Sequence, residues 1–154
     1  MKTLEAVRYR QRLNNLFSQI SAFSGDAELQ SQWARYLCVL VSGFLEVSIC
    51  AIYNQFTRQS ASPHVANFVK CQLDSFQNPK MGKIIDLTKA FNSEWANELE
   101  RQTAGRLKDA VDSVVANRHL IAHGRDVGIT YARIKSYYED TIKVIEIIEK
   151  NCGI

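Results

Sequence analysis

"YLCVLVSGFLEVSICAI", residues 36 to 52, is apolar or small at nearly every position. A membrane-spanning helix needs about 20 apolar residues. This stretch is shorter, and it contains Glu46, whose charge is costly in lipid unless it is paired. We therefore expect a helix that is buried on most of its circumference, in a protein core, in a subunit interface, or in both.

The composition around this stretch is that of one ordinary globular domain. The chain has 154 residues, of which 46% are hydrophobic and 23% are charged, a balance typical of folded chains. Only two prolines and seven glycines interrupt it, which favours long periodic helices. We predict an all-α, up-and-down helical bundle of four main helices plus short helices, forming a single domain over residues 1–154.

Apolar residues recur at helical spacing along most of the chain, and Asp26, Pro63 and Thr130 stand where helices should begin. The segment at 77–82 reads as a turn. The predicted helices cover residues 3–23, 27–59, 63–76, 84–87, 93–99, 104–123 and 131–148.

The long helix over residues 27–59 should pack along one continuous seam. A second face, almost opposite, holds Val39, Ile49 and Tyr53 together with Ser42 and Glu46. The predicted seam consists of Leu29, Trp33, Leu37, Leu40, Phe44, Val47 and Ala51.

Charge and cysteine usage set mild limits on function. The net charge of +3 permits a polyanionic partner without arguing for one, because dedicated nucleic-acid binders usually show a stronger basic imbalance.

The four cysteines, at positions 38, 50, 71 and 152, show no C-x-x-C pairing. We expect buried, reduced thiols in a cytoplasmic protein. The first residues contain no apolar stretch, so we expect no secretory signal and no membrane partner.

"NRHLIAHG", residues 117 to 124, concentrates the candidate chemistry, with two of the chain's three histidines. On a helical wheel, Arg118 falls inside the apolar stripe formed by Leu107, Val111, Val114 and Ile121. An unpaired buried charge is very costly. Arg118 must therefore meet a carboxylate, backbone carbonyls, a cleft or an anionic ligand. A structural salt bridge inside the bundle, for which Glu46 is a candidate partner, is one of these alternatives.

Gly124 predicts the end of this helix, with the glycine in the left-handed position after the cap. If the helix stays regular, His123 points roughly 140° away from Arg118. A loosened last turn would let the two side chains converge on one cleft.

His119 and His123 also have the i, i+4 spacing of a zinc-binding pair. The stretch lacks the glutamate of H-E-x-x-H, and His64 and the isolated cysteines are weak candidates for a third ligand. We therefore expect neither a metal site nor a cofactor.

The stretch Asn117-Arg118-His119-Leu120-Ile121-Ala122-His123 resembles the signature of HEPN-domain ribonucleases. In that signature an Arg, often followed directly by a polar residue, precedes a His by four to six intervening residues. The segments "WARYLCVLVSGFLE" (33–46) and "HLIAHGRDVGITYARIKSYYEDTIKVIE" (119–146) look similar to the RiboL-PSP-type branch in particular. The resemblance covers most of the chain.

This resemblance implies a small helical bundle that forms a homodimer, with the motif helices facing each other and two Arg/His pairs sharing one cleft. It implies metal-independent cleavage of RNA, in which the ribose 2′-hydroxyl attacks the adjacent phosphate and leaves a cyclic phosphate and a 5′-hydroxyl. In such a site Arg118 binds the scissile phosphate and His123 moves a proton. His119 positions the pair or contacts phosphate.

Supporting roles are open for several polar residues. Glu46 either orients Arg118 from behind or pairs with another nearby cation. Asn117 and Arg125 flank the motif and either touch RNA or are simply solvated. The same alternatives, a phosphate-binding surface or a solvated face, apply to Arg8, Arg10, Arg12, Lys80, Lys83 and Lys89.

Three functional settings follow. The first is an endoribonuclease in a toxin–antitoxin or phage-defence system, with RNA as substrate and an antitoxin or defence protein as partner. The second is a non-catalytic HEPN-like interaction or adaptor module. The third is a purely structural helical dimer in which Arg118 forms a core salt bridge.

Overall fold

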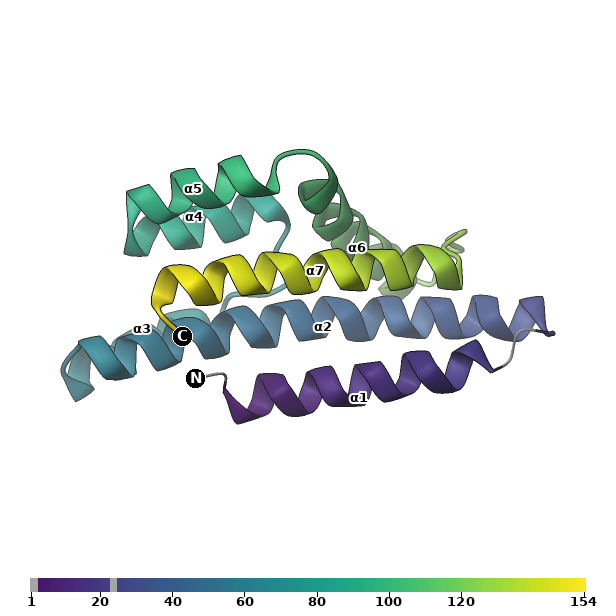
Figure 1. Ribbon diagram of the computed structural model, residues 1–154, viewed down its shortest axis with the longest axis horizontal. Coiled ribbons are helices and arrows are strands. Elements are labelled where there is room, and N and C mark those ends of the chain that lie inside the picture. The colour runs from purple at the N-terminus through teal and green to yellow at the C-terminus, as the bar shows by residue number, and fades with distance from the viewer. Residues whose placement is uncertain (1–2, 23–24) are drawn as a thin grey trace.

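The computed structural model of the chain describes residues 3–22 and 25–154. These residues form seven α-helices and contain no strand (Figure 1), so the predicted all-helical class is confirmed. Four helices are long and three are short, as expected. Phe23, the last residue of the predicted first helix, lies outside the described residues. The helices are α1 (Leu4–Ser21), α2 (Ala27–Ser60), α3 (Pro63–Leu73), α4 (Met81–Phe91), α5 (Ser93–Thr103), α6 (Arg106–Ala122) and α7 (Tyr131–Cys152).

Local sequence signals place several helix ends correctly. Asp26 caps α2 by accepting a hydrogen bond from the Leu29 backbone N–H at 3.0 Å, and Thr130 caps α7 through the Arg133 N–H at 3.1 Å. Pro63 is the first residue of α3. Each of these caps satisfies a backbone donor that the helix itself leaves without an acceptor.

The predicted boundaries fail at all three short helices. α3 ends at Leu73 rather than at residue 76, α4 covers Met81–Phe91 rather than 84–87, and α5 continues to Thr103 rather than ending at residue 99. No side chain next to α4 in the sequence caps its start. Instead, Asp112 of α6 accepts the Met81 backbone N–H at 2.8 Å, and such a cap from another helix leaves no local signal in the sequence.

α2 is the central helix and packs against α1, α3, α6 and α7. Figure 1 shows α7 and α1 running along it on opposite sides, with α6 starting above α7 and descending behind it. The fully or almost fully buried residues of α2 include Ala34, Cys38, Val41, Leu45 and Ile52. The long helix is therefore the core of the bundle, as its composition indicates.

The predicted seam of α2 is only partly correct. Leu37 and Phe44 are buried, but the other five members, at positions 29, 33, 40, 47 and 51, are half-buried. From the second predicted face, Ile49 and Tyr53 are buried and Val39 is half-buried. Because this helix is apolar around most of its circumference, hydrophobic periodicity does not distinguish the side that α7 covers.

α2 is also long and apolar enough to cross a membrane by length and composition alone. In the folded chain, 56% of its most apolar 18-residue window is buried against the other helices. That burial fits the prediction of a core helix over residues 36–52.

Among the cysteines, Cys38 and Cys152 are buried, Cys50 is half-buried and Cys71 is exposed. Burial raises the pKa of Cys38 to about 12. The expectation of buried thiols is therefore wrong for Cys71, because α3 has only one buried residue, Leu73, and the rest of that helix lies on the surface.

Leu45 tests the central role of α2, because it is fully buried there. We expect Leu45→Ala to lower the free energy of unfolding by about 2–5 kcal/mol, through lost apolar burial and the cavity left behind. Urea denaturation followed by circular dichroism measures the change. Val65→Ala is the control, because Val65 is 51% exposed and should shift stability by less than about 0.5 kcal/mol. Equal effects of both substitutions would contradict the assignment of the core.

Candidate functional site

The motif stretch 117–124 lies at the C-terminal end of α6, and the helix closes there in a tight and specific way. Gly124 has φ +69°, its N–H donates to Ile121 O at 3.0 Å, and the Arg125 N–H donates to Leu120 O at 3.0 Å. These two bonds form a Schellman motif, which ends helices on a left-handed residue. The predicted role of Gly124 is confirmed.

The tight end keeps His123 in register with the helix. The His123 N–H donates to His119 O at 3.2 Å, and the His119 and His123 rings touch edge to face with centroids 4.4 Å apart. Both residues are exposed. The last turn is therefore not loosened, and the partner of His123 within the chain is His119 rather than Arg118.

Arg118 lies one turn beyond buried Val114 on the inward side of α6. The buried stripe of this helix consists of Ala110, Val111, Val114 and Val115, so it ends before Arg118, which is half-buried. Among residues 3–22 and 25–154, the Arg118 guanidinium forms no hydrogen bond or ion pair. A core salt bridge does not account for Arg118 in this structure.

Glu46 does not support Arg118. Its Oε2 accepts the backbone N–H of Asn78 at 2.8 Å, so the carboxylate holds the loop between α3 and α4. This loop contains the one non-glycine residue with positive φ in the described ranges, Asn78 at +49°, a conformation that asparagine tolerates better than most residues.

The two polar residues that flank the motif, Asn117 and Arg125, differ in their contacts. The Asn117 amide donates to Ser113 O at 2.9 Å, one turn back on the same helix. Arg125 is exposed. Arg35 of α2 pairs with Asp126 at 2.8 Å and ties the loop after the motif to the central helix.

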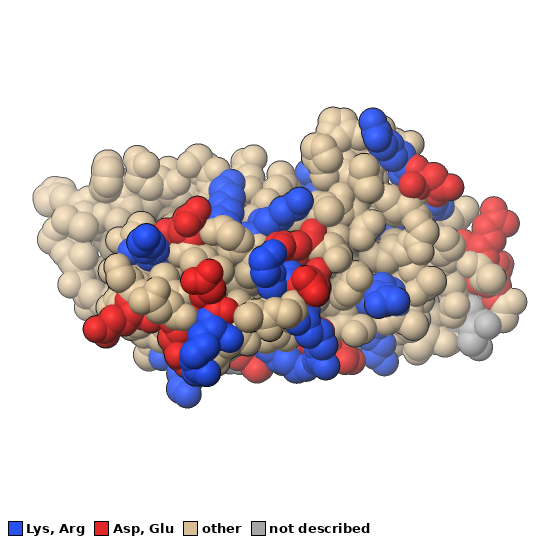
Figure 2. Space-filling view, turned by 90° about the horizontal axis from the view of Figure 1, so that it is seen from above, with Lys and Arg blue, Asp and Glu red and all other residues tan. Residues whose placement is uncertain are grey.

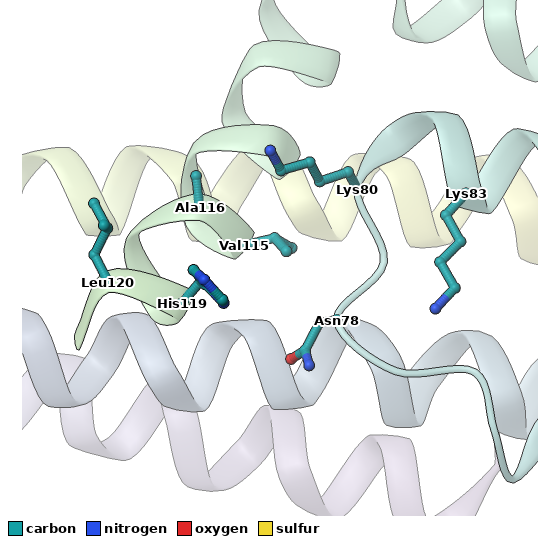
Figure 3. Close-up of a pocket in the computed structure, with 7 residues that line it drawn as sticks. All are labelled: Asn78, Lys80, Lys83, Val115, Ala116, His119 and Leu120. Atoms are coloured by element: carbon teal, nitrogen blue, oxygen red, sulfur yellow. The ribbon is translucent and has the colours of Figure 1, made fainter. Parts of the chain in front are cut away.

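An open groove of about 600 Å³ lies between the end of α6 and the loop that precedes α4. Asn78, Lys80 and Lys83 line one wall, and His119 lies on the other wall with Leu120. Figure 3 shows the Lys80 side chain extending from the loop toward α6, above the His119 ring. Lys83 lines the same groove, but its side chain extends away from His119. The structure thus brings one lysine, Lys80, distant in sequence, toward the helix that carries the motif histidine.

The chain is only mildly basic, with a net charge of +3. On the face in Figure 2, basic and acidic side chains are interspersed and form no continuous field of one sign. This distribution agrees with the net charge of +3. Any anion-binding site must therefore arise from local grouping of cations rather than from the overall charge.

The histidine pair has no further ligand group beside it. In the part of the chain that the structure describes, no cluster of three or more His, Cys, Asp or Glu residues has the geometry to hold a metal ion.

Comparison with protein families identifies the family of this chain. The RiboL-PSP-HEPN family model matches residues 5–152, which includes every helix from α2 to α7 and nearly all of α1. This chain belongs to the RiboL-PSP-HEPN family. HEPN domains are associated with ribonuclease or nucleotide-binding functions. Comparison with curated proteins and with solved structures gives no match.

In this HEPN domain the three motif residues lie at the end of α6, but their side chains do not share one side of the helix. His119 and His123 are together, and Arg118 lies on a different side of α6, since a regular helix separates it from His123 by roughly 140°. Sequence reasoning missed Asn78 and Asp112, which shape the groove. Only contacts between distant segments reveal them.

Glu46→Ala tests the support of the groove loop. Loss of the hydrogen bond to the Asn78 N–H should weaken protection of that amide by about 1 kcal/mol, or roughly fivefold faster hydrogen exchange measured by NMR. Glu46→Gln keeps an acceptor oxygen and should retain most of the protection. If Glu46→Ala leaves Asn78 as protected as in the unaltered protein, the carboxylate does not hold the loop.

Proposed function

We propose that this HEPN domain is a metal-independent endoribonuclease whose active centre forms between two chains. The observation that carries the proposal is the half-buried Arg118, whose guanidinium has no counter-charge among the described residues. A guanidinium held without a carboxylate partner on a folded surface is suited to bind phosphate with two parallel hydrogen bonds. An anionic ligand accounts for its placement better than a structural role does.

The histidine pair supports the same chemistry. Histidine is the side chain whose ordinary pKa suits proton transfer near neutral pH. His123 is exposed at the end of α6 and its ring touches that of His119. In the proposed reaction, one histidine takes the proton of the ribose 2′-hydroxyl as its oxygen attacks the phosphorus. The bond between phosphorus and the 5′-oxygen breaks as a protonated histidine of the cleft donates a proton to that oxygen, and the products are a 2′,3′-cyclic phosphate and a 5′-hydroxyl.

Arg118 stabilises this reaction by binding the phosphate oxygens, on which negative charge accumulates when five oxygens surround phosphorus. His119, in contact with His123, fixes the orientation of its neighbour. Arg125 and Asn117 lie beside these residues and are candidates for contacts with the RNA backbone.

The two-chain centre follows from the separation of Arg118 and His123 around α6. A second copy, related by two-fold symmetry, presents its own α6 in the opposite direction. The Arg118 of one chain then faces the histidines of its partner across a shared cleft. In this arrangement the reaction has both an arginine and a histidine, although Arg118 and His123 of one chain point in different directions.

The decisive test is cleavage of total RNA in EDTA. We expect Arg118→Ala and His123→Ala each to reduce cleavage at least 100-fold, with unchanged thermal unfolding for Arg118→Ala because its guanidinium has no partner to lose. Arg58→Ala and His64→Ala are matched controls on exposed surfaces and should cleave normally. The products should have cyclic phosphate ends.

If the unaltered protein and the Arg118→Ala, His123→Ala double variant leave RNA equally intact, the catalytic proposal fails. A large loss of stability in Arg118→Ala would instead support a structural role for this arginine.

The dimer has its own test. Light scattering should give a mass near twice that of the 17.5 kDa chain. Mixing Arg118→Ala and His123→Ala chains should restore cleavage well above that of either variant alone, because a mixed dimer retains one arginine and one histidine in its cleft. A strict monomer that still cleaves RNA would exclude the shared centre.

We further propose that the activity operates in a toxin–antitoxin or phage-defence setting, with an antitoxin or defence protein as partner. Growth arrest on expression that disappears with His123→Ala supports this setting.

The alternative, a non-catalytic adaptor, is favoured by the divergence of Arg118 and His123 within one chain. It predicts that the chain binds its partner equally well with either residue replaced.

A further inference from the structure

We propose that the groove beside His119 is a binding subsite for single-stranded RNA, in which Lys80 holds a phosphate next to the cleavage centre and Lys83 adds positive charge farther along the groove. This inference rests on the proposed ribonuclease function and adds residues that the motif does not contain. It assigns the α3–α4 loop and the start of α4 to recognition of the RNA backbone.

The wall that carries Lys80 is fixed from both sides. Asn78 is held by Glu46 of α2, and Met81 is held by Asp112 of α6, each through a backbone N–H to a carboxylate oxygen at 2.8 Å. Lys80 lies between these two anchored residues. Its backbone is therefore positioned before any ligand binds, which lowers the entropy that binding must overcome.

The lysines retain charge for a ligand. The Lys80 ammonium forms no hydrogen bond or ion pair within residues 3–22 and 25–154. Lys83 donates to the Gln77 carbonyl at 2.8 Å and lies 5.4 Å from the centroid of the Phe76 ring, so neither contact neutralises it.

The nearby acids do not line the groove. The Asp112 carboxylate accepts the Met81 N–H and also pairs with Lys108 at 2.5 Å. Glu46 accepts the Asn78 N–H. Together with the start of α4, whose helix dipole is positive at that end, the groove wall favours an anion.

The opposite wall suits the rest of a nucleotide. Val115, Ala116 and Leu120 give it an apolar surface, next to His119, and the flat face of a base packs on such a surface. His119 in turn touches His123. A strand whose phosphate sits on Lys80 therefore passes directly to the proton-transfer residues, and this continuity favours RNA over an acidic protein segment as the occupant.

Binding of a labelled 2′-O-methyl RNA octanucleotide tests the subsite, because this RNA has no 2′-hydroxyl to attack and is not cleaved. Fluorescence anisotropy is measured over a range of salt concentrations. We expect Lys80→Ala to weaken binding about fivefold to tenfold. Lys80→Ala with Lys83→Gln should reduce the slope of log affinity against log salt by roughly 0.7, since the subsite holds one phosphate and each phosphate contact to a single strand contributes about 0.7.

Lys89→Ala is the matched control, because Lys89 is an exposed lysine of the same helix and does not line the groove. It should bind like the unaltered protein. Equal losses for Lys89→Ala and Lys80→Ala, or no loss in the double variant, would overturn the subsite. Tight binding of a poly-glutamate peptide with the same dependence on Lys80 would also overturn it in favour of an acidic protein partner.

The two proposals can fail separately. If the unaltered protein cleaves RNA while the lysine variants bind and cleave normally, the subsite is wrong and the ribonuclease stands. If the lysine variants lose binding but the unaltered protein never cleaves, the RNA-binding groove stands and the ribonuclease is wrong.

Discussion

Burial of α2 is the constraint on which the rest of the structure depends. The helix is apolar around most of its circumference, so it is stable in water only when α1, α3, α6 and α7 cover it. Covering it from several sides places α6 beside α2 and brings the α3–α4 loop to Glu46. The motif helix and the groove loop are thus neighbours because both lie against one buried helix.

Around this core, charged side chains act mainly on backbone groups. Glu46 and Asp112 each hold one N–H of the segment from Asn78 to Met81, and the Schellman bonds at Gly124 close α6. These contacts are local in space and fix short segments rather than large surfaces. Two of them position the backbone on either side of Lys80.

The same rigidity separates Arg118 from the histidines. A regular helix end keeps His119 and His123 in contact and leaves Arg118 on another side of α6, half-buried and without a counter-charge among the described residues. The family to which the chain belongs is associated with ribonuclease or nucleotide-binding functions. The centre that we propose between two chains would reconcile that association with the geometry of a single chain.

The amino-acid sequence by itself determined the all-helical class, the helix starts at Asp26 and Thr130, the left-handed end at Gly124 and the family motif. Each depends on a few consecutive residues or on helical periodicity, and local physics suffices for these. Only the tertiary structure decided which side of α2 is buried, what Glu46 contacts and where Lys80 lies. Glu46 accepts a hydrogen bond from a backbone N–H 32 positions away. Because α2 is apolar around most of its circumference, its hydrophobic periodicity does not show which side is buried. Such contacts arise only when the whole bundle packs.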